Sequence, residues 1–279
     1  MIKVLYQILF FTAVINSLLF SQQALQQQYE YAEKLYSKGN YFDAVTELKR
    51  LVFFDSARQY YYKAYMLMGS SYKNGTLLND AVSCFSTAER FSRSDDEKYK
   101  ASVELVRVNI LRRSTEQALK IINRLESSGL FKDRQDSLNY WKGWAYIFAG
   151  SFDKASDEFH KIPGQFELDS LCRATDNAQY SERLAKILSV FLPGAGQFYT
   201  GNYINGIISL AWNIFSGYLT INSFAEDRVF DGIVTANLLW LRFYIGGIQN
   251  SEEFAHNNNI TIINRTLLYL QNEFTGLKP

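Results

Sequence analysis

The sequence predicts an all-α protein in which a solenoid of helical hairpins is followed by a hydrophobic helical membrane module. Three observations predict this organisation. Only three prolines occur in 279 residues, so little interrupts the helices. No charged residue lies between Lys186 and Glu226, although the chain carries 29 basic and 28 acidic residues. Alanines recur every 37 residues, at Ala44, Ala81, Ala118 and Ala155.

The composition narrows the classes of function. The chain is 47% hydrophobic and 16% aromatic, which supplies enough apolar surface for a core and excludes wholesale disorder. Its net charge of +1 argues against a nucleic-acid binder driven by bulk charge. Two cysteines and two histidines exclude a disulfide scaffold and a cysteine-rich metal site. We therefore expect no nucleic-acid partner, no metal and no cofactor.

Residues 1–21 predict a secretory signal peptide. One positive charge at Lys3 precedes an apolar, uncharged run from Val4 to Phe20, and a polar stretch begins at Gln22. This order of charged, apolar and polar regions is typical of an export signal, with cleavage expected after Ser21. An uncleaved anchor helix and a buried first helix are the alternatives. The Ser-Gln-Gln exit resembles the signal peptides of Bacteroidetes-type bacteria, which implies a bacterial envelope protein.

Residues 22–165 predict about four helix pairs. Other columns keep the 37-residue register of the alanines. Four residues after each alanine come Leu48, Phe85, Ile122 and Phe159, and twelve before come Ala32, Gly69, Val106 and Gly143. The small residues allow two helices to approach closely, and the larger residue fills the space beside them. Such units bury their apolar faces by stacking. An irregular helical bundle is the alternative.

The stretch from Trp141 to Phe159 resembles the tetratricopeptide repeat, and residues 32–51 resemble it nearly as well. The third copy lacks the glycine and aromatic positions and resembles it least. The resemblance implies an array with a concave groove for a peptide or a partner helix. The groove residues expected on the first helix of each pair are Tyr29, Glu33, Tyr36, Met66, Lys73, Arg107, Tyr140 and Trp144. Packing between repeats is the alternative role for several of these aromatic residues.

After a linker over residues 166–183, residues 184–250 predict the membrane module. Two spans are expected, at about residues 203–223 and 230–248, because about 20 apolar residues cross a bilayer. A buried hydrophobic cap on the repeat array is the soluble alternative. Arg242 lies inside the second span, where a charge is costly unless it snorkels or pairs.

Residues 251–279 predict an amphipathic C-terminal helix whose start is interrupted by three consecutive asparagines at 257–259. This helix is expected to lie on the membrane or to dock on the spans.

A helix break joins the linker to the first span, because Pro193 removes a backbone donor and glycines follow it. The first motif is formed by Pro193, Gly194, Gly196, Gln197, Tyr199, Gly201 and Gly206, and the second by Arg242, Tyr244 and Gly246. Together they resemble a small bacterial membrane family of unknown function, which implies membrane association and no reaction. These residues either break a helix and pack the spans, or act on a lipid, an ion or a substrate.

These observations predict a non-catalytic, membrane-anchored scaffold or adaptor that binds a protein or peptide partner in the bacterial cell envelope. The expected location is the inner membrane, with the repeats in the periplasm and membrane lipid as a second partner. The first alternative is a component of a membrane assembly or transport system that uses the broken-helix motif and Arg242. An enzyme with an unrecognised site and a soluble helical protein are further alternatives, although the chain carries none of the familiar hydrolase, zinc or phosphate-loop motifs.

Overall fold

The structure, a computed structural model, describes residues 22–279, and every regular element in that range is helical. The all-α prediction is therefore confirmed for this part of the chain. The predicted signal peptide at residues 1–21 lies outside the described residues. The chain divides into two compact units, which are Met1–Phe166 together with Lys278–Pro279, and Glu167–Leu277.

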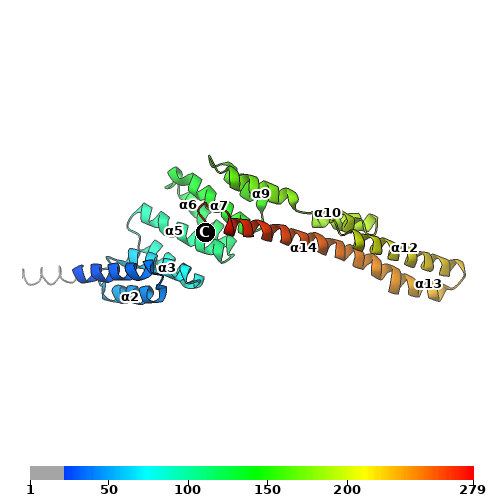
Figure 1. The fold of residues 1–279 in the computed structure, drawn as a ribbon, viewed down its shortest axis with the longest axis horizontal. Coiled ribbons are helices and arrows are strands. Elements are labelled where there is room, and N and C mark those ends of the chain that lie inside the picture. Colours follow the sequence, from blue (N-terminus) through cyan, green and yellow to red (C-terminus); the bar gives the residue numbers. More distant parts are fainter. Residues whose placement is uncertain (1–21) are drawn as a thin grey trace, which may run out of the picture. The chain divides into compact units, whose positions relative to one another are not determined.

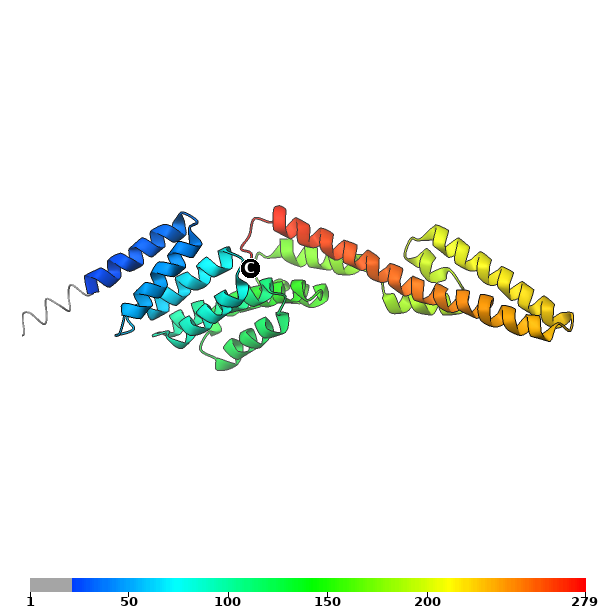
Figure 2. The same cartoon turned by 90° about the horizontal axis from the view of Figure 1, so that it is seen from below.

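The first unit is a succession of helices that pack in chain order (Figures 1 and 2). From α2 to α8, each helix contacts the next one along the chain. After a helix over residues 22–37, the elements are α2 (Tyr41–Phe54), α3 (Tyr61–Asn74), α4 (Leu78–Arg90), α5 (Asp95–Leu111), α6 (Thr115–Ser128), a short 3-10 turn (Lys132–Arg134), α7 (Gln135–Phe148) and α8 (Phe152–His160).

The residues of the 37-residue register lie inside the helix pairs. The four alanines are buried, and so are the four larger residues that follow them by one helical turn. A Cβ atom placed on Gly69 would lie 2.6 Å from the ring of Phe85, and one placed on Gly143 would lie 2.6 Å from the ring of Phe159. A glycine at these positions therefore lets the aromatic ring pack directly on the backbone of the facing helix.

The backbone repeats with the same period. The residue two positions after the first helix of each pair has a positive φ: +80° at Gly39, +63° at Thr76, +57° at Arg113 and +76° at Gly150. In each case the next amide donates to a carbonyl five residues earlier, as Asn40 N does to Leu35 O at 3.0 Å. This pattern is the Schellman motif, which satisfies the free carbonyls at a helix end. All four turns share one geometry, although glycine occupies the left-handed position in only two of them.

The second unit consists of α9 (Phe166–Ala178), α10 (Glu182–Phe191), α11 (Ala195–Tyr199), α12 (Tyr203–Ala225), α13 (Val229–Thr235), a π-helical turn η2 (Ala236–Leu241) and α14 (Arg242–Asn272). The helix break predicted at Pro193 is confirmed, since α10 ends before it and α11 starts after it. Helix α12 and the α13–α14 segment form a hairpin and lie side by side in both views (Figures 1 and 2).

Two predicted boundaries are wrong. Residues 166–183, predicted as a linker, form α9 and the first turn of α10 and belong almost entirely to the second unit. Residues 251–279 do not begin a separate helix, because α14 runs through the asparagines at 257–259 without a break. Asn259 accounts for the continuity, since its side chain accepts from Tyr180 N at 2.7 Å and donates to Tyr180 O at 2.9 Å. The three asparagines, predicted to interrupt the helix, thus lie within it, and Asn259 binds the backbone of a neighbouring segment.

The side chains of α12 are distributed in the reverse of a soluble helix. Small and polar residues face inward, and large apolar residues face outward. The buried residues are Gly206, Asn213, Ser216, Gly217, Thr220 and Ser223, and the exposed ones include Ile204, Ile207, Ile214, Phe215, Tyr218 and Ile221. Among the described helices, α12 is the one that is long and apolar enough to cross a membrane.

Candidate functional site

In the first unit, charged side chains from α3 and α5 meet an aromatic ring from α7. These helices are each the first, or A, helix of a pair, and we call the four residues Lys73, Glu104, Arg107 and Trp141 the helix-A row. Lys73 Nζ lies 3.0 Å from Glu104 Oε2, and Glu104 also pairs with Arg107 one turn later on α5. The Arg107 guanidinium lies 5.1 Å from the centroid of the Trp141 ring, which is a cation–π distance. The row therefore joins three helices, and its two cations share a single carboxylate, which leaves one positive charge in excess.

A segment without regular structure rests on this row. Arg107 Nη2 donates to the backbone carbonyl of Lys278 at 2.9 Å, and Lys278 belongs to the same compact unit. The Nε atom of Arg107 is buried and has no hydrogen-bond partner among the described residues. The guanidinium thus holds a main-chain acceptor of a non-helical segment, and an extended peptide offers the same kind of acceptor at every residue.

Two further groove residues predicted from the sequence are accessible. Glu33 is exposed, and Tyr36 is half-buried with its hydroxyl accepting from Asn74 Nδ2 at 3.0 Å. Lys73 and Arg107 of the row are less open, since their side chains are 14% and 19% exposed and already paired.

Of the other predicted groove residues, Trp144 is buried, whereas Tyr140, Tyr29 and Met66 are half-buried and pack against neighbouring side chains. Trp144 is only 2% exposed, so its prediction as a groove residue is wrong; the indole fills the space between helices. Tyr140 lies edge-on to Phe159, with 5.9 Å between ring centroids. Tyr29 lies 5.7 Å from Tyr60, and burial raises the pKa of the Tyr29 hydroxyl above its ordinary value. Met66 packs beside the core cluster around Phe85. The sequence analysis missed Glu104 and Trp141, which stand 37 residues apart in one column of the repeat.

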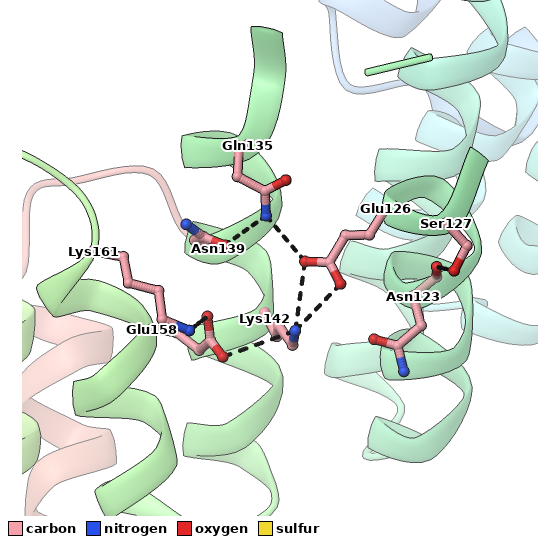
Figure 3. Close-up of polar contacts among 8 residues, drawn as sticks. All are labelled: Asn123, Glu126, Ser127, Gln135, Asn139, Lys142, Glu158 and Lys161. Carbon is pink, nitrogen blue, oxygen red and sulfur yellow. Dashed lines mark hydrogen bonds and ion pairs between the residues drawn. The ribbon is translucent and has the colours of Figure 1, made fainter. Parts of the chain in front are cut away.

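A second polar network fastens α6 to α7 and α8 (Figure 3). Lys142 Nζ lies 3.3 Å from Glu126 Oε2 and 3.8 Å from Glu158 Oε1. Glu158 is 7% exposed and is also paired with Lys161 Nζ at 2.8 Å. Gln135 Nε2 donates to Glu126 Oε1 at 3.1 Å. Because each carboxylate has a cationic partner, this cluster holds the three helices together and offers no unpaired carboxylate for acid–base chemistry.

In the second unit, the first motif forms a packing centre around Gln197, which is 1% exposed. Its Nε2 donates to Gly247 O at 2.7 Å, and its Oε1 accepts from Ser189 Oγ at 3.2 Å. The Ser189 hydroxyl also accepts from Gly196 N at 3.0 Å. One glutamine thereby joins α11 to α10 and α14, and its own hydrogen-bonding groups are satisfied.

The glycines of the motif are required by close backbone contacts. A Cβ atom on Gly194 would lie 2.3 Å from the carbonyl oxygen of Gly206, and one on Gly196 would lie 2.1 Å from Ala185 O. A Cβ atom on Gly206 would lie 2.7 Å from the ring of Phe198. These residues let α10, α11 and α12 meet at distances that no larger side chain permits. Pro193 and Gly201 (φ +77°) form the turns on either side of α11.

The motif tyrosines also hold backbone groups. The Tyr199 hydroxyl accepts from Ser181 N at 3.1 Å, and the Tyr244 hydroxyl donates to Val190 O at 2.7 Å. Most residues of the two motifs therefore serve to hold the helices of the second unit together.

Arg242 and Gly246 are the exceptions among the motif residues. Arg242 makes no ion pair or hydrogen bond within residues 22–279, and a Cβ atom on Gly246 would meet open space. Both residues line a cavity of about 310 Å³ beside Gln197, together with Asn205, Ser209 and Asn250. One wall of this cavity is a pair of stacked rings, Trp212 and Phe243, whose centroids are 5.0 Å apart with 8° between their planes.

The described chain carries no arrangement suited to metal or thiol chemistry. No cluster of three histidine, cysteine, aspartate or glutamate side chains that could hold a metal occurs in residues 22–279. Both cysteines are free and buried. Burial raises the pKa of the Cys84 thiol to about 11 and that of Cys172 to about 12. Both thiols therefore stay protonated and unreactive at neutral pH.

Comparisons with known proteins leave these sites to be interpreted from their own chemistry. The chain matches no protein-family model, no curated protein and no solved structure.

Proposed function

We propose that the protein is a non-catalytic scaffold or adaptor in which a tetratricopeptide-like array, carried by a membrane-inserted helical hairpin, binds a protein or peptide segment in the bacterial envelope. The extracytoplasmic side is proposed from the sequence of residues 1–21. Peptide binding is assigned to the helix-A row with Tyr36 and Glu33 beside it.

One observation carries the adaptor proposal, and it is the hydrogen bond from Arg107 to the carbonyl of Lys278. A non-helical segment already lies on the row, and it is held through its main chain. A side chain that bonds a backbone carbonyl tolerates a peptide of variable sequence, because every residue offers this acceptor. The neighbouring Trp141 ring and the Lys73–Glu104 pair hold the guanidinium in place, so little side-chain entropy is lost on binding.

The membrane anchor is supported by the surface of α12. Only 28% of its most apolar window is buried, and its outward face is made of isoleucines and aromatic rings. In water such a face would be an apolar patch requiring cover, whereas in lipid it is the natural exterior. The helix has 23 residues, which as an α-helix is about 35 Å and suffices to cross the hydrocarbon core.

The adaptor proposal is tested by capturing partners with the full chain from detergent-solubilised envelopes. Replacing Arg107→Gln should reduce the recovered partner at least tenfold, whereas Arg112→Gln, which changes the exposed C-cap residue of the same helix, should leave it unchanged. Circular dichroism of both variants establishes that they are folded. Equal recovery with the two variants would refute the assignment of the row.

The anchor is tested separately by extracting membranes with alkaline carbonate. The full chain should remain in the pellet. Release into the supernatant would show that α12 is covered by protein, as in the soluble alternative.

A second candidate function, in a membrane assembly or transport system, is favoured by one observation. The cavity in the second unit contains an arginine without a partner among the described residues.

A further inference from the structure

The cavity beside Gln197 contains hydrogen-bond donors and no acid. Its lining includes Arg242, Asn205, Asn250 and Ser209, and no aspartate or glutamate contributes to it. The Oγ atom of Ser209 is buried and has no partner among the described residues. Arg242 likewise makes no ion pair there, although a guanidinium offers five donors. The site is therefore built for an acceptor-rich, negatively charged group that the chain itself does not supply.

Arg242 is exposed, so the cost of leaving its charge unpaired depends on what surrounds the hairpin. It follows the π-helical turn Ala236–Leu241 directly, at the start of α14 and facing α12 across the cavity. Turns of this type are frequent at functional sites. If the hairpin lies in lipid, as proposed above, an arginine at this place needs a counter-charge or a path to the interface. A planar guanidinium matches the geometry of a phosphate, to which it can donate two parallel hydrogen bonds.

The remainder of the cavity selects a lipid over a free anion. Trp212 and Phe243 form a flat aromatic wall, and Ile208 and Phe254 extend the apolar lining. This lining continues onto the exposed isoleucines of α12. A volume of about 310 Å³ is small for a ligand site and accommodates a headgroup but not acyl chains. The chains would then lie along the apolar face outside.

We infer that this cavity binds the phosphate of an anionic phospholipid, with Arg242 pairing with the phosphate and the apolar rim receiving the start of the acyl chains. Ser209 and the two asparagines supply neutral donors around the headgroup. The inference rests on the proposed membrane anchor and adds a ligand class to it.

The test uses the full chain purified in a neutral detergent. Bound lipid is counted by native mass spectrometry during titration with phosphatidylglycerol, with phosphatidylcholine and with inorganic phosphate in parallel. The wild-type chain should retain one phosphatidylglycerol at concentrations where phosphatidylcholine is not retained. Inorganic phosphate at the same concentration should not displace it.

Three variants locate the site. Arg242→Gln should weaken the retention of phosphatidylglycerol at least tenfold, and Arg242→Lys should weaken it less. Gly246→Leu, which fills open space in the cavity and keeps the arginine, should also abolish retention. Arg265→Gln, an exposed arginine on the same helix outside the cavity, is the matched control and should bind as the wild type does.

Several results would overturn the inference. They are equal retention of the two lipids by the wild type, unchanged binding in both Arg242→Gln and Gly246→Leu, and displacement by inorganic phosphate, which would make the ligand a soluble anion. If the chain resists carbonate extraction but shows no lipid preference, the cavity assignment fails and the anchor stands. If carbonate releases the chain, both fail.

Discussion

The left-handed residue that recurs between paired helices leads to a prediction about stability. Thr76 and Arg113 occupy positions where φ is +63° and +57°, whereas the equivalent Gly39 and Gly150 adopt +80° and +76°. A residue with a Cβ atom loses about 1–2 kcal/mol in this conformation. Glycine avoids that loss but gains unfolded-state entropy worth about 0.5–1 kcal/mol. We therefore expect Thr76→Gly to stabilise the first unit by about 0.5–1 kcal/mol.

The Thr76 side chain contributes little that would be lost. It is exposed and makes no side-chain hydrogen bond within the described residues. Thr76→Ala is the matched control, because it removes the side chain but keeps the Cβ atom, and its effect should stay within about 0.5 kcal/mol. Gly39→Ala is the reciprocal change. A Cβ atom there would meet nothing within 4 Å, so the expected destabilisation of about 0.5–1 kcal/mol, net of the unfolded-state entropy, comes from the backbone alone.

The buried thiol of Cys84 on α4 reports on this unit within the full chain. Its labelling rate in dilute urea, followed by mass spectrometry, measures how often the helix pair opens. Thr76→Gly should slow labelling roughly two- to fivefold, the factor that corresponds to 0.5–1 kcal/mol. Gly39→Ala should accelerate it. If Thr76→Gly labels as fast as Thr76→Ala, the backbone at this turn is not strained and the reasoning is wrong.

Three further predictions concern the repeat unit. Gly143→Ala places a Cβ atom 2.6 Å from the Phe159 ring and should cost about 1–3 kcal/mol in urea unfolding; a cost below 0.5 kcal/mol would mean that the helices separate freely. At pH 7 the Cys84 thiol, with a pKa of about 11, should react with iodoacetamide at least about a hundredfold slower than an unfolded-state cysteine. Lys100, one turn later, and Arg134 hold the pKa of the Asp96 carboxyl below its ordinary value. The stability that Asp96 contributes is therefore present above the ordinary pKa and is lost as the pH falls through the lowered pKa. Asp96→Asn should flatten the pH dependence of the unfolding midpoint below about pH 5, and an unchanged profile would show that solvent screens these ion pairs.

The repeat register was predictable because helix pairing depends on residue size at fixed intervals. The alanine column and the glycines that face Phe85 and Phe159 could be found from spacing alone. The third turn could not, since Arg113 carries no sign of a left-handed conformation. There, packing of the flanking helices fixes the chain ends, and the local preference of the residue is overridden. A search for glycine at the left-handed position therefore finds two of the four equivalent turns.

The sites were harder to predict because they depend on which side of a helix faces its neighbours. Trp144 carries a large apolar ring, and a ring of this kind serves equally well in a groove or in a core until the helix rotation is known. Position 104 looks like an ordinary surface acid, and only the approach of α3 gives it a lysine partner. The asparagines at 257–259 suggested a break because their partners lie far away in sequence, as Asn258 shows by donating to Thr200 O at 2.9 Å.

If the hairpin lies in lipid, as proposed, the reversed side-chain distribution of α12 changes which force assembles the hairpin. In hydrocarbon, exclusion of water cannot draw two helices together, so association depends on shape and on hydrogen bonds between surfaces. Ser216 and Gly217 supply a smooth inner face, and Thr220 Oγ1 reaches Thr235 Oγ1 across the hairpin at 3.3 Å. Replacing these small and polar residues by larger apolar ones would therefore weaken the association of the two helices in lipid. In a core that forms in water, a more apolar interface would strengthen it.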